Sequence, residues 1–219
     1  MIDWGKIETV LLDMDGTLLD LNSDTEFWLE YIPLALAKKK KITLQEAKLE
    51  MDDKLGKVHG KIEWYCLDYW KKELGLPILA LKHEISHLIK MRPDTIPFLN
   101  ALKTSGKRVV LVTNAHPDDL DLKLEKTRLD NHIDELISSH TFGAVKEDQS
   151  LWIELQNHLG FQNKSTLFID DTHQVLLAAK KFGIKYLMAV DNPNSQRPKK
   201  KIDGFQNVSD FRTLLKHII

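Results

Sequence analysis

Residues 9–17 of the chain are Thr9-Val10-Leu11-Leu12-Asp13-Met14-Asp15-Gly16-Thr17. The first four are apolar or β-branched, which is typical of a strand that is covered on both faces inside a parallel sheet. Asp13 ends this run, so its carboxylate is expected at the carboxyl end of the strand. In open α/β sheets the functional crevice lies at that end.

The rest of the chain after residue 92 alternates between apolar runs and amphipathic segments. We expect further strands at residues 108–112, 133–138, 166–169 and 184–190, and helices at residues 94–106, 117–128, 147–159 and 173–182. Strands that alternate with helices imply a parallel sheet with helices on both faces. The predicted fold class is therefore α/β, a doubly wound, Rossmann-like parallel sheet.

Residues 26–91 have a different, helical character. Thr43 and Glu46 have the spacing of a capping box, and Pro33 is expected to kink or break the first helix. Residues 64–71 form a third helical face. Because this stretch lies between the first and second strands, we expect an inserted helical subdomain at residues 21–92. Residues 1–20 and 93–219 would then form the core domain.

Composition limits the classes of partner. The formal net charge of −1 gives no field that would attract a nucleic acid polymer or an anionic membrane. Cys66 is the single cysteine, so an intrachain disulfide and a CxxC metal site are excluded. No basic-then-apolar leader begins the chain, and no apolar run approaches the ~20 residues that span a bilayer. We expect a monomeric, cytoplasmic protein.

Polar residues gather where the predicted strands end. They are Asp13 and Asp15, Thr113 and Asn114, Asp170 and Asp171, and Lys146 at the start of a helix. Several carboxylates in one small site repel each other unless a cation is present, and ligation by oxygen alone suits Mg²⁺. Lys146 and Thr113 would then supply donors for a phosphoryl group, which suggests phosphoryl transfer. An Asp-Gly pair alone is often a plain turn, but three strand ends and a lysine are expected to meet here.

These residues form an ordered set of motifs. Asp13-Met14-Asp15-Gly16-Thr17 resembles the first motif of the haloacid dehalogenase superfamily, and Thr113-Asn114, Lys146 and Asp170-Asp171 resemble its other three motifs. The resemblance covers the whole core. It implies the fold predicted above, with the helical segment as a C1-type cap that closes over small substrates.

The resemblance also implies a role for each residue. Asp13 would be the nucleophile that forms an aspartyl-phosphate, and Asp15 would act as the general acid and base. Mg²⁺ would be held by the Asp13 carboxylate, the backbone carbonyl of Asp15 and the fourth motif. Asp171 aligns with the direct ligand, whereas Asp170 would act through water or support the ligands. The same resemblance implies that Thr113, the Asn114 backbone and Lys146 bind the phosphoryl oxygens.

Longer strings resemble one subgroup of this family, the bacterial nucleotidases that act on GMP and IMP. They are residues 10–21, 64–70, 94–99, 113–117 and 140–143. The resemblance implies a small phosphomonoester substrate, a purine nucleoside 5′-monophosphate. Trp64, Tyr65, Tyr69 and Trp70 offer aromatic faces for the base, although alternate members of a helix must face the core. His116, directly after Thr113-Asn114-Ala115, is a candidate substrate contact.

Other functions use similar residues. A sugar-phosphate phosphatase or a β-phosphoglucomutase-like phosphotransferase would share the site, whereas a dehalogenase would lack Asp15 and the metal. A non-catalytic phosphate-accepting switch also joins acids, a threonine and a lysine around Mg²⁺. Finally, His83-Glu84-Ile85-Ser86-His87 matches the HExxH zinc pattern with both histidines on one helix face, but no third ligand follows it.

Overall fold

The computed structural model describes residues 2–218 and contains a six-stranded sheet in the order β3-β2-β1-β4-β5-β6. All neighbouring strands are parallel. The strands are β1 (Thr9–Leu12), β2 (Arg108–Thr113), β3 (Glu135–Ser138), β4 (Thr166–Asp170), β5 (Tyr186–Val190) and β6 (Gln206–Val208). The predicted α/β fold class is therefore confirmed. The short edge strand β6 was not predicted, because Val208 is its one buried apolar residue.

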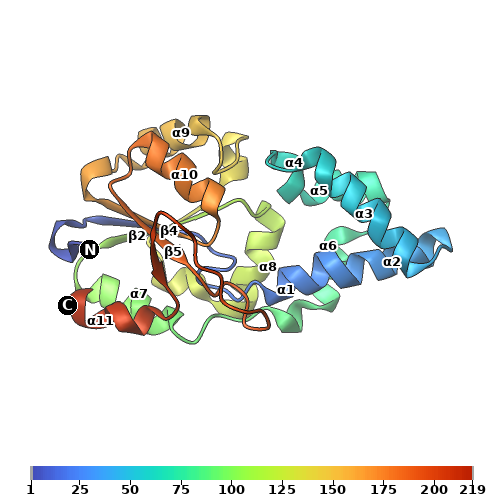
Figure 1. Cartoon of the computed structure of the whole chain (residues 1–219), viewed down its shortest axis with the longest axis horizontal. Helices are drawn as coiled ribbons and strands as arrows, with labels where there is room; N and C mark the ends of the chain where they lie inside the picture. The colour runs from blue at the N-terminus through green and yellow to red at the C-terminus, as the bar shows by residue number, and fades with distance from the viewer. Residues whose placement is uncertain (1, 219) are drawn as a thin grey trace.

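Eleven α-helices accompany the sheet in the described chain. They are α1 (Asn22–Glu26), α2 (Ile32–Lys40), α3 (Leu44–Val58), α4 (Ile62–Tyr65), α5 (Leu67–Leu74), α6 (Ile78–Glu84), α7 (Thr95–Thr104), α8 (Pro117–Thr127), α9 (Gln149–Leu159), α10 (His173–Phe182) and α11 (Leu215–Ile218). Figure 1 shows α9 and α10 on one face of the sheet and α7 and α11 on the other.

Two apolar clusters cover the two faces of the sheet. Successive side chains of a strand point to opposite faces, so Val10 and Leu12 enter one cluster and Leu11 enters the other. The first cluster includes Phe98 of α7, and the second includes Trp152 of α9. This burial fixes the register of β1 and holds its carboxyl end, residue 13, at one edge of the sheet.

The helical segment between β1 and β2 has an apolar core of its own. The buried side chains of this third cluster come from residues 27–78 and include Phe27, Met51 and Trp70. In Figure 1 the segment, α1 to α6, lies beside the sheet rather than against either of its faces. None of the helices in residues 2–218 is both long and apolar enough to cross a bilayer.

Two local predictions for this segment are confirmed or refined. Thr43 and Glu46 form the capping box that opens α3, with the Glu46 N–H donating to Thr43 Oγ1 at 3.2 Å. Pro33 lies in the first turn of α2 and does not break the helical run, because a π-helical turn, Phe27–Tyr31, precedes it. The wider turn accommodates a residue that has no N–H for an intrahelical bond.

Two other local predictions are wrong. The third helix is split at Cys66, whose backbone is extended and whose Sγ accepts a hydrogen bond from the Tyr69 N–H at 3.4 Å. Cys66 thus caps α5 instead of continuing α4. The HExxH pattern does not share a helix face, since α6 ends at Glu84 and His87 lies in a 3₁₀ turn.

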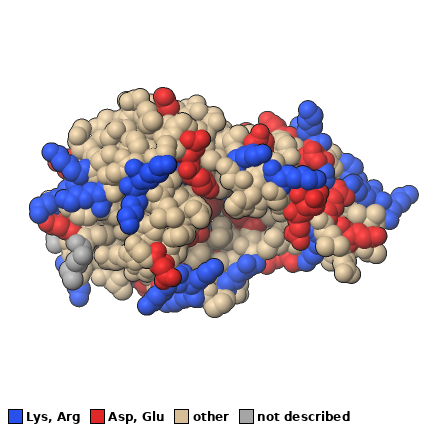
Figure 2. All heavy atoms as spheres, turned by 45° about the horizontal axis from the view of Figure 1, so that its top comes forward, with Lys and Arg blue, Asp and Glu red and all other residues tan. Residues whose placement is uncertain are grey.

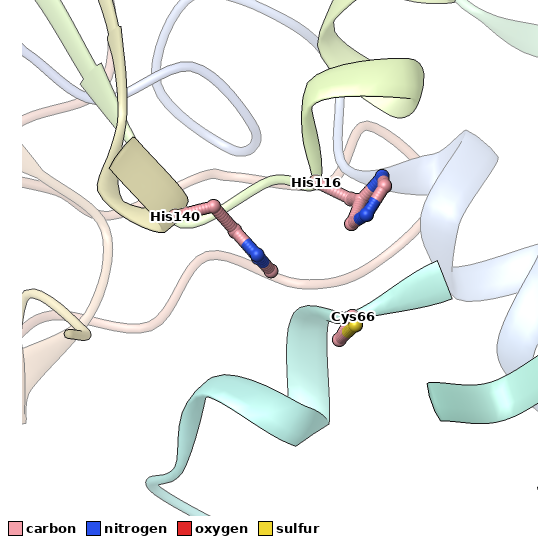
Figure 3. A group of neighbouring side chains, drawn as sticks. All are labelled: Cys66, His116 and His140. Atoms are coloured by element: carbon pink, nitrogen blue, oxygen red, sulfur yellow. The ribbon is translucent and has the colours of Figure 1, made fainter. Parts of the chain in front are cut away.

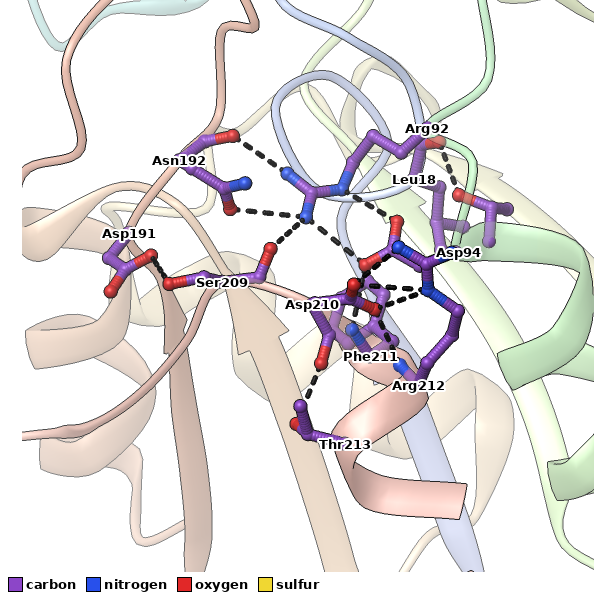
Figure 4. Close-up of polar contacts among 11 residues, drawn as sticks. Leu18, Arg92, Asp94, Asp191, Asn192, Ser209, Asp210, Phe211, Arg212 and Thr213 are labelled. Carbon is purple, nitrogen blue, oxygen red and sulfur yellow. Dashed lines mark hydrogen bonds and ion pairs between the residues drawn. The ribbon is translucent and has the colours of Figure 1, made fainter.

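A buried arginine fastens the chain where it leaves the helical segment (Figure 4). The Arg92 guanidinium pairs with Asp94 at 3.3 Å and donates to the Asn192 and Ser209 carbonyls at 2.8 and 3.0 Å. The Phe211 N–H donates to Asp94 at 2.7 Å. These contacts join the start of α7 to the loops that follow β5 and β6, and so steady the edge of the sheet that carries the site.

Candidate active site

Three carboxylates converge at the carboxyl ends of β1 and β4. The Asp13 N–H donates to the Ile169 carbonyl at 3.0 Å, which extends the pairing of the two strands by one residue. Oxygens of Asp13, Asp170 and Asp171 lie within 4.8 Å of one another. Asp13 and Asp170 are buried, and Asp171 is partly exposed. The expected meeting of these three residues therefore occurs.

Lys146 reaches this group of carboxylates from the neighbouring loop. Its Nζ contacts Asp13 Oδ1 and lies 2.7 Å from Asp170 Oδ2. Its backbone is held from both sides, because its N–H donates to Asn114 Oδ1 at 2.9 Å and its carbonyl accepts from the Trp152 indole at 2.8 Å. Lys146 precedes α9 by a short loop rather than starting the helix, as the sequence had suggested.

The carboxylates outnumber the ammonium group. Burial raises the pKa of Asp170 to about 7, although Lys146 opposes this shift. Burial, followed by repulsion from Asp170 and Asp13, raises the pKa of Asp171 well above its ordinary value. Lys146 is held charged, since its two carboxylate partners outweigh its own burial and raise its pKa. The excess of buried negative charge, carried by oxygen donors alone, fits a hard divalent cation such as Mg²⁺.

Thr113 and Asn114 follow β2 beside these acids. Thr113 Oγ1 accepts from the Ala115 N–H at 3.1 Å. The Asn114 side chain is committed within the protein, because its Nδ2 donates to Glu147 at 3.0 Å and its Oδ1 binds the Lys146 N–H. Asn114 therefore positions the lysine loop.

Asp15 follows Asp13 by two residues, but its carboxylate belongs to a second charged cluster. Lys123 of α8 contacts Asp15, Asp24 and Asp119 at 2.8, 2.7 and 3.1 Å, and Lys82 of α6 contacts Asp24 and Asp119 at 2.8 Å each. We call these residues the five-residue ion cluster. Burial raises the pKa of Asp15 to about 7, and Lys123 opposes the shift. The Asp15 side chain is thus absent from the group that Asp13 forms with Asp170 and Asp171.

A cavity of about 350 Å³ lies between the helical segment and the strand ends. Its lining includes Asp13, Asp171, Thr113 and Lys146 from the core and Trp28, Trp64 and Tyr65 from the helical segment. Figure 2 shows the surface hollowed between the two parts, with acidic side chains along the hollow. The volume suits a small organic ligand.

The four aromatic residues of α4 and α5 divide between cavity and core. Trp64 and Tyr65 line the cavity, whereas Trp70 is fully buried in the core of the helical segment and Tyr69 packs against it. His116 does not line the cavity. It caps α8 by accepting the Asp118 N–H at 3.3 Å.

Gly16 is required where it stands. Its φ of +89° suits glycine, and a Cβ there would meet Asp171 Oδ2 at 2.5 Å. The turn after Asp15 can therefore pass close to Asp171 only without a side chain.

The sequence did not reveal Lys123, Asp24 or Glu147. Lys123 and Asp119 have the i, i+4 spacing of an exposed ion pair, and α8 was interpreted as a polar surface helix. Asp24 lies 99 residues before Lys123, so no local pattern connects them. The signal that was available is the large number of charges on a helix that directly follows a candidate motif.

Comparisons with known proteins identify the family of this chain. Residues 7–183 match the family model described as haloacid dehalogenase-like hydrolase. The chain is 46% identical over 218 residues to GMP/IMP nucleotidase YrfG of Escherichia coli K12, covering 100% of this chain and 98% of that protein. It is 26% identical to phosphoglycolate phosphatase of Aquifex aeolicus, covering 84% and 85%.

Solved structures show the same fold. A HAD phosphatase from Thermococcus onnurineus superimposes with a TM-score of 0.79 at 23% identity and covers 96% of this chain and 97% of its own. An L-2-haloacid dehalogenase from Xanthobacter autotrophicus gives a TM-score of 0.66 at 16% identity, with the same coverage. The family model and the full-length relative together establish that this chain belongs to the haloacid dehalogenase-like hydrolases.

Proposed function

We propose that this protein is a Mg²⁺-dependent phosphomonoesterase that hydrolyses purine nucleoside 5′-monophosphates such as GMP and IMP. The observation that carries the proposal is the meeting of Asp13, Asp170 and Asp171 with Lys146 at the floor of a cavity. Support for the substrate class comes from the 46% identical relative, which is named a GMP/IMP nucleotidase.

The Asp13 and Asp171 carboxylates would hold the ion, with the Asp15 backbone carbonyl beside them and Asp170 acting through water. When bound, Mg²⁺ neutralises charge on the phosphoryl oxygens and on the acids around them. Lys146 adds a fixed positive charge at Asp13, and Thr113 supplies a hydroxyl for a phosphoryl oxygen. These groups orient the phosphorus toward Asp13, which is the main requirement of phosphoryl transfer.

In the first step an Asp13 carboxylate oxygen attacks phosphorus, and the bond from phosphorus to the nucleoside oxygen breaks. Asp15 gives a proton to that leaving oxygen, so the nucleoside departs as an alcohol. In the second step Asp15 takes a proton from water, whose oxygen attacks the phosphorus of the aspartyl-phosphate. Inorganic phosphate leaves and the Asp13 carboxylate is regenerated.

We further propose that residues 21–92 form a cap over the core of residues 1–20 and 93–219. The separate apolar core of the helical segment supports this division. So does the pairing of its two connections, where the Asp20 N–H donates to the Lys90 carbonyl at 2.9 Å. Trp64 and Tyr65 would cover the nucleoside and keep water from the aspartyl-phosphate.

The test is phosphate release from a panel of phosphomonoesters with Mg²⁺ present. We expect GMP and IMP to be hydrolysed faster than pyrimidine nucleotides, sugar phosphates and phosphoglycolate. Chelation should stop turnover, and added Mg²⁺ should restore it. Faster hydrolysis of a sugar phosphate, or transfer that retains the phosphoryl group, would contradict the nucleotidase assignment. Stable phosphorylation without turnover would instead indicate a phosphate-accepting switch.

The monomeric state, the cytoplasmic location and a substrate contact by His116 stay predictions from the sequence. Size-exclusion chromatography with light scattering tests the first and cell fractionation tests the second. For the third, His116→Ala should raise the KM for GMP more than it lowers kcat.

A further inference from the structure

A second group of potential metal ligands lies at the boundary between the helical segment and the core. Cys66 Sγ and a ring nitrogen from each of His116 and His140 lie within 4.8 Å of one another. Figure 3 shows Cys66 on the helical segment facing the two histidines, which come from the loops after β2 and β3. None of the three lines the cavity described above.

His140 is prepared to act as a ligand. Its Nε2 is buried and has no hydrogen-bond partner in residues 2–218. A histidine that binds a metal through Nε2 keeps its proton on Nδ1, and an unpartnered Nε2 is the atom through which His140 would bind.

Cys66 and His116 are held in place by the helices that they begin. Cys66 caps α5 through a long contact of 3.4 Å from the Tyr69 N–H to its Sγ, and His116 caps α8 through one of 3.3 Å from the Asp118 N–H to its Nδ1. Metal binding by His116 would replace the second of these contacts, because an accepting Nδ1 leaves the ring proton on Nε2. The two imidazole rings meet edge to face with centroids 5.1 Å apart. The Asp68 carboxylate lies 3.9 Å from His116 Nε2, at the open side of the group.

We propose that Cys66, His116 and His140 bind one Zn²⁺-class transition-metal ion that links the helical segment to the core. One thiolate and two imidazoles suit Zn²⁺ and not Mg²⁺, which prefers oxygen. The fourth position is left to water or to Asp68. From zinc–nitrogen and zinc–sulfur bonds of about 2.1 and 2.3 Å, tetrahedral ligands lie about 3.5 Å apart. Because the three atoms lie within 4.8 Å of one another, the group needs to contract by about 1.3 Å at most.

Binding replaces the thiol proton by the metal and releases that proton to solvent. The ion would fasten Cys66, which directly follows the cavity residue Tyr65, to His140 in the turn after β3. If the helical segment must move to admit substrate, as the proposed function requires, the ion will slow turnover. That consequence rests on the proposed function, whereas the binding itself does not.

The test is a titration of the full-length, reduced protein with Co²⁺ as a spectroscopic substitute for Zn²⁺, with Mg²⁺ in excess. We expect one equivalent to produce a thiolate–cobalt charge-transfer band and the visible bands of tetrahedral cobalt, and Zn²⁺ to displace both. Carboxylates cannot produce the charge-transfer band, so the Asp13 site does not interfere. C66S should abolish that band, and H140Q should weaken binding about tenfold or more.

Matched control variants distinguish metal binding at this site from metal binding by other histidines of the protein. H83Q and H87Q change the exposed histidines of the HExxH pattern and should leave the spectra unchanged. Serine at position 66 keeps a helix cap, so C66S should fold, and circular dichroism without metal checks this. Absence of a cysteine-dependent band in the wild-type protein, or equal affinity in H140Q, would overturn the proposal. Either result can be obtained whether or not the protein hydrolyses GMP.

Discussion

Two buried charged clusters form part of the same cavity wall, and they differ in how far their charges are balanced. In the first, Asp13, Asp170 and Asp171 share a single ammonium group, that of Lys146. In the five-residue ion cluster, three carboxylates face two ammonium groups, and each carboxylate contacts at least one. Burial is common to both. The unbalanced charge of the first is the reason that we propose it as the site for a cation and a phosphoryl group, whereas the second has the composition of a structural connection.

The electrostatics of the second cluster reflect this balance. Although Asp24 is largely removed from solvent, which raises its pKa, its two lysine partners outweigh this effect and lower the pKa. Asp15 has only Lys123 as a partner, and burial raises its pKa to about 7. Asp15 is thus the member of the ion cluster in which burial outweighs pairing, and it is the member that we assign to proton transfer.

The largest expected effect comes from removing the proposed nucleophile, Asp13 of the first cluster. D13N keeps the size of the side chain but cannot form the aspartyl-phosphate, so we expect kcat/KM for GMP to fall by at least about 10³-fold. Phosphate release measures the loss. D121N, which changes an exposed acid on α8, should retain wild-type activity. Comparable activity in D13N, with normal circular dichroism, would contradict the nucleophile assignment.

A substitution in the five-residue ion cluster should lower the free energy of unfolding. K123M leaves Asp15, Asp24 and Asp119 without the ammonium group that contacts all three, and Lys123 is 2% exposed. Removing one partner of a buried ion cluster costs about 3–5 kcal/mol, because uncompensated charge stays buried. Urea unfolding measures this, with K126M on the exposed face of α8 as the control, expected within about 0.5 kcal/mol of wild type. A loss below about 1 kcal/mol would show that the cluster is not structural.

Mg²⁺ distinguishes the two clusters, because we expect it to bind to the carboxylates of the first cluster and not to those of the second. At 100 times its Kd it should stabilise the fold by about 2.7 kcal/mol, which corresponds to a rise in Tm of about 5–10 °C. D171N should lose this response, since one ligand is missing. Sodium chloride at equal ionic strength is the control in differential scanning calorimetry. An unchanged Mg²⁺ response in D171N would place the ion elsewhere.

The two clusters also differ in how well the sequence predicted them. Asp13, Thr113 and Asp170 end apolar strands, and parallel strands bring their carboxyl ends to one edge, so the first site followed from periodicity. Lys82, Asp24 and Lys123 belong to three separate helices, and helical charge patterns do not say which face of a helix another segment of the chain will cover. The contacts at the boundary between the helical segment and the core therefore could not be predicted from the sequence.

The same limit applies to Cys66. Local helical periodicity ran through residues 64–71, but the chain turns at Cys66 so that α5 can start with a new cap. The break brings Cys66 near His116 and His140, which lie 50 and 74 positions further along the sequence. The HExxH pattern, which is local, forms no such group within the described residues.

The smallest expected effect comes from the apolar side of the cavity, to which neither charged cluster contributes. Trp64 lines the cavity and packs against His59 with ring centroids 5.3 Å apart. If its indole contacts the purine, W64L removes a stacking interaction of about 1 kcal/mol, so the KM for GMP should rise about fivefold. The KM for ribose 5-phosphate, which has no base, should stay the same. Equal changes for both substrates would indicate that Trp64 supports the helical segment and does not contact the base, because a structural defect weakens both alike.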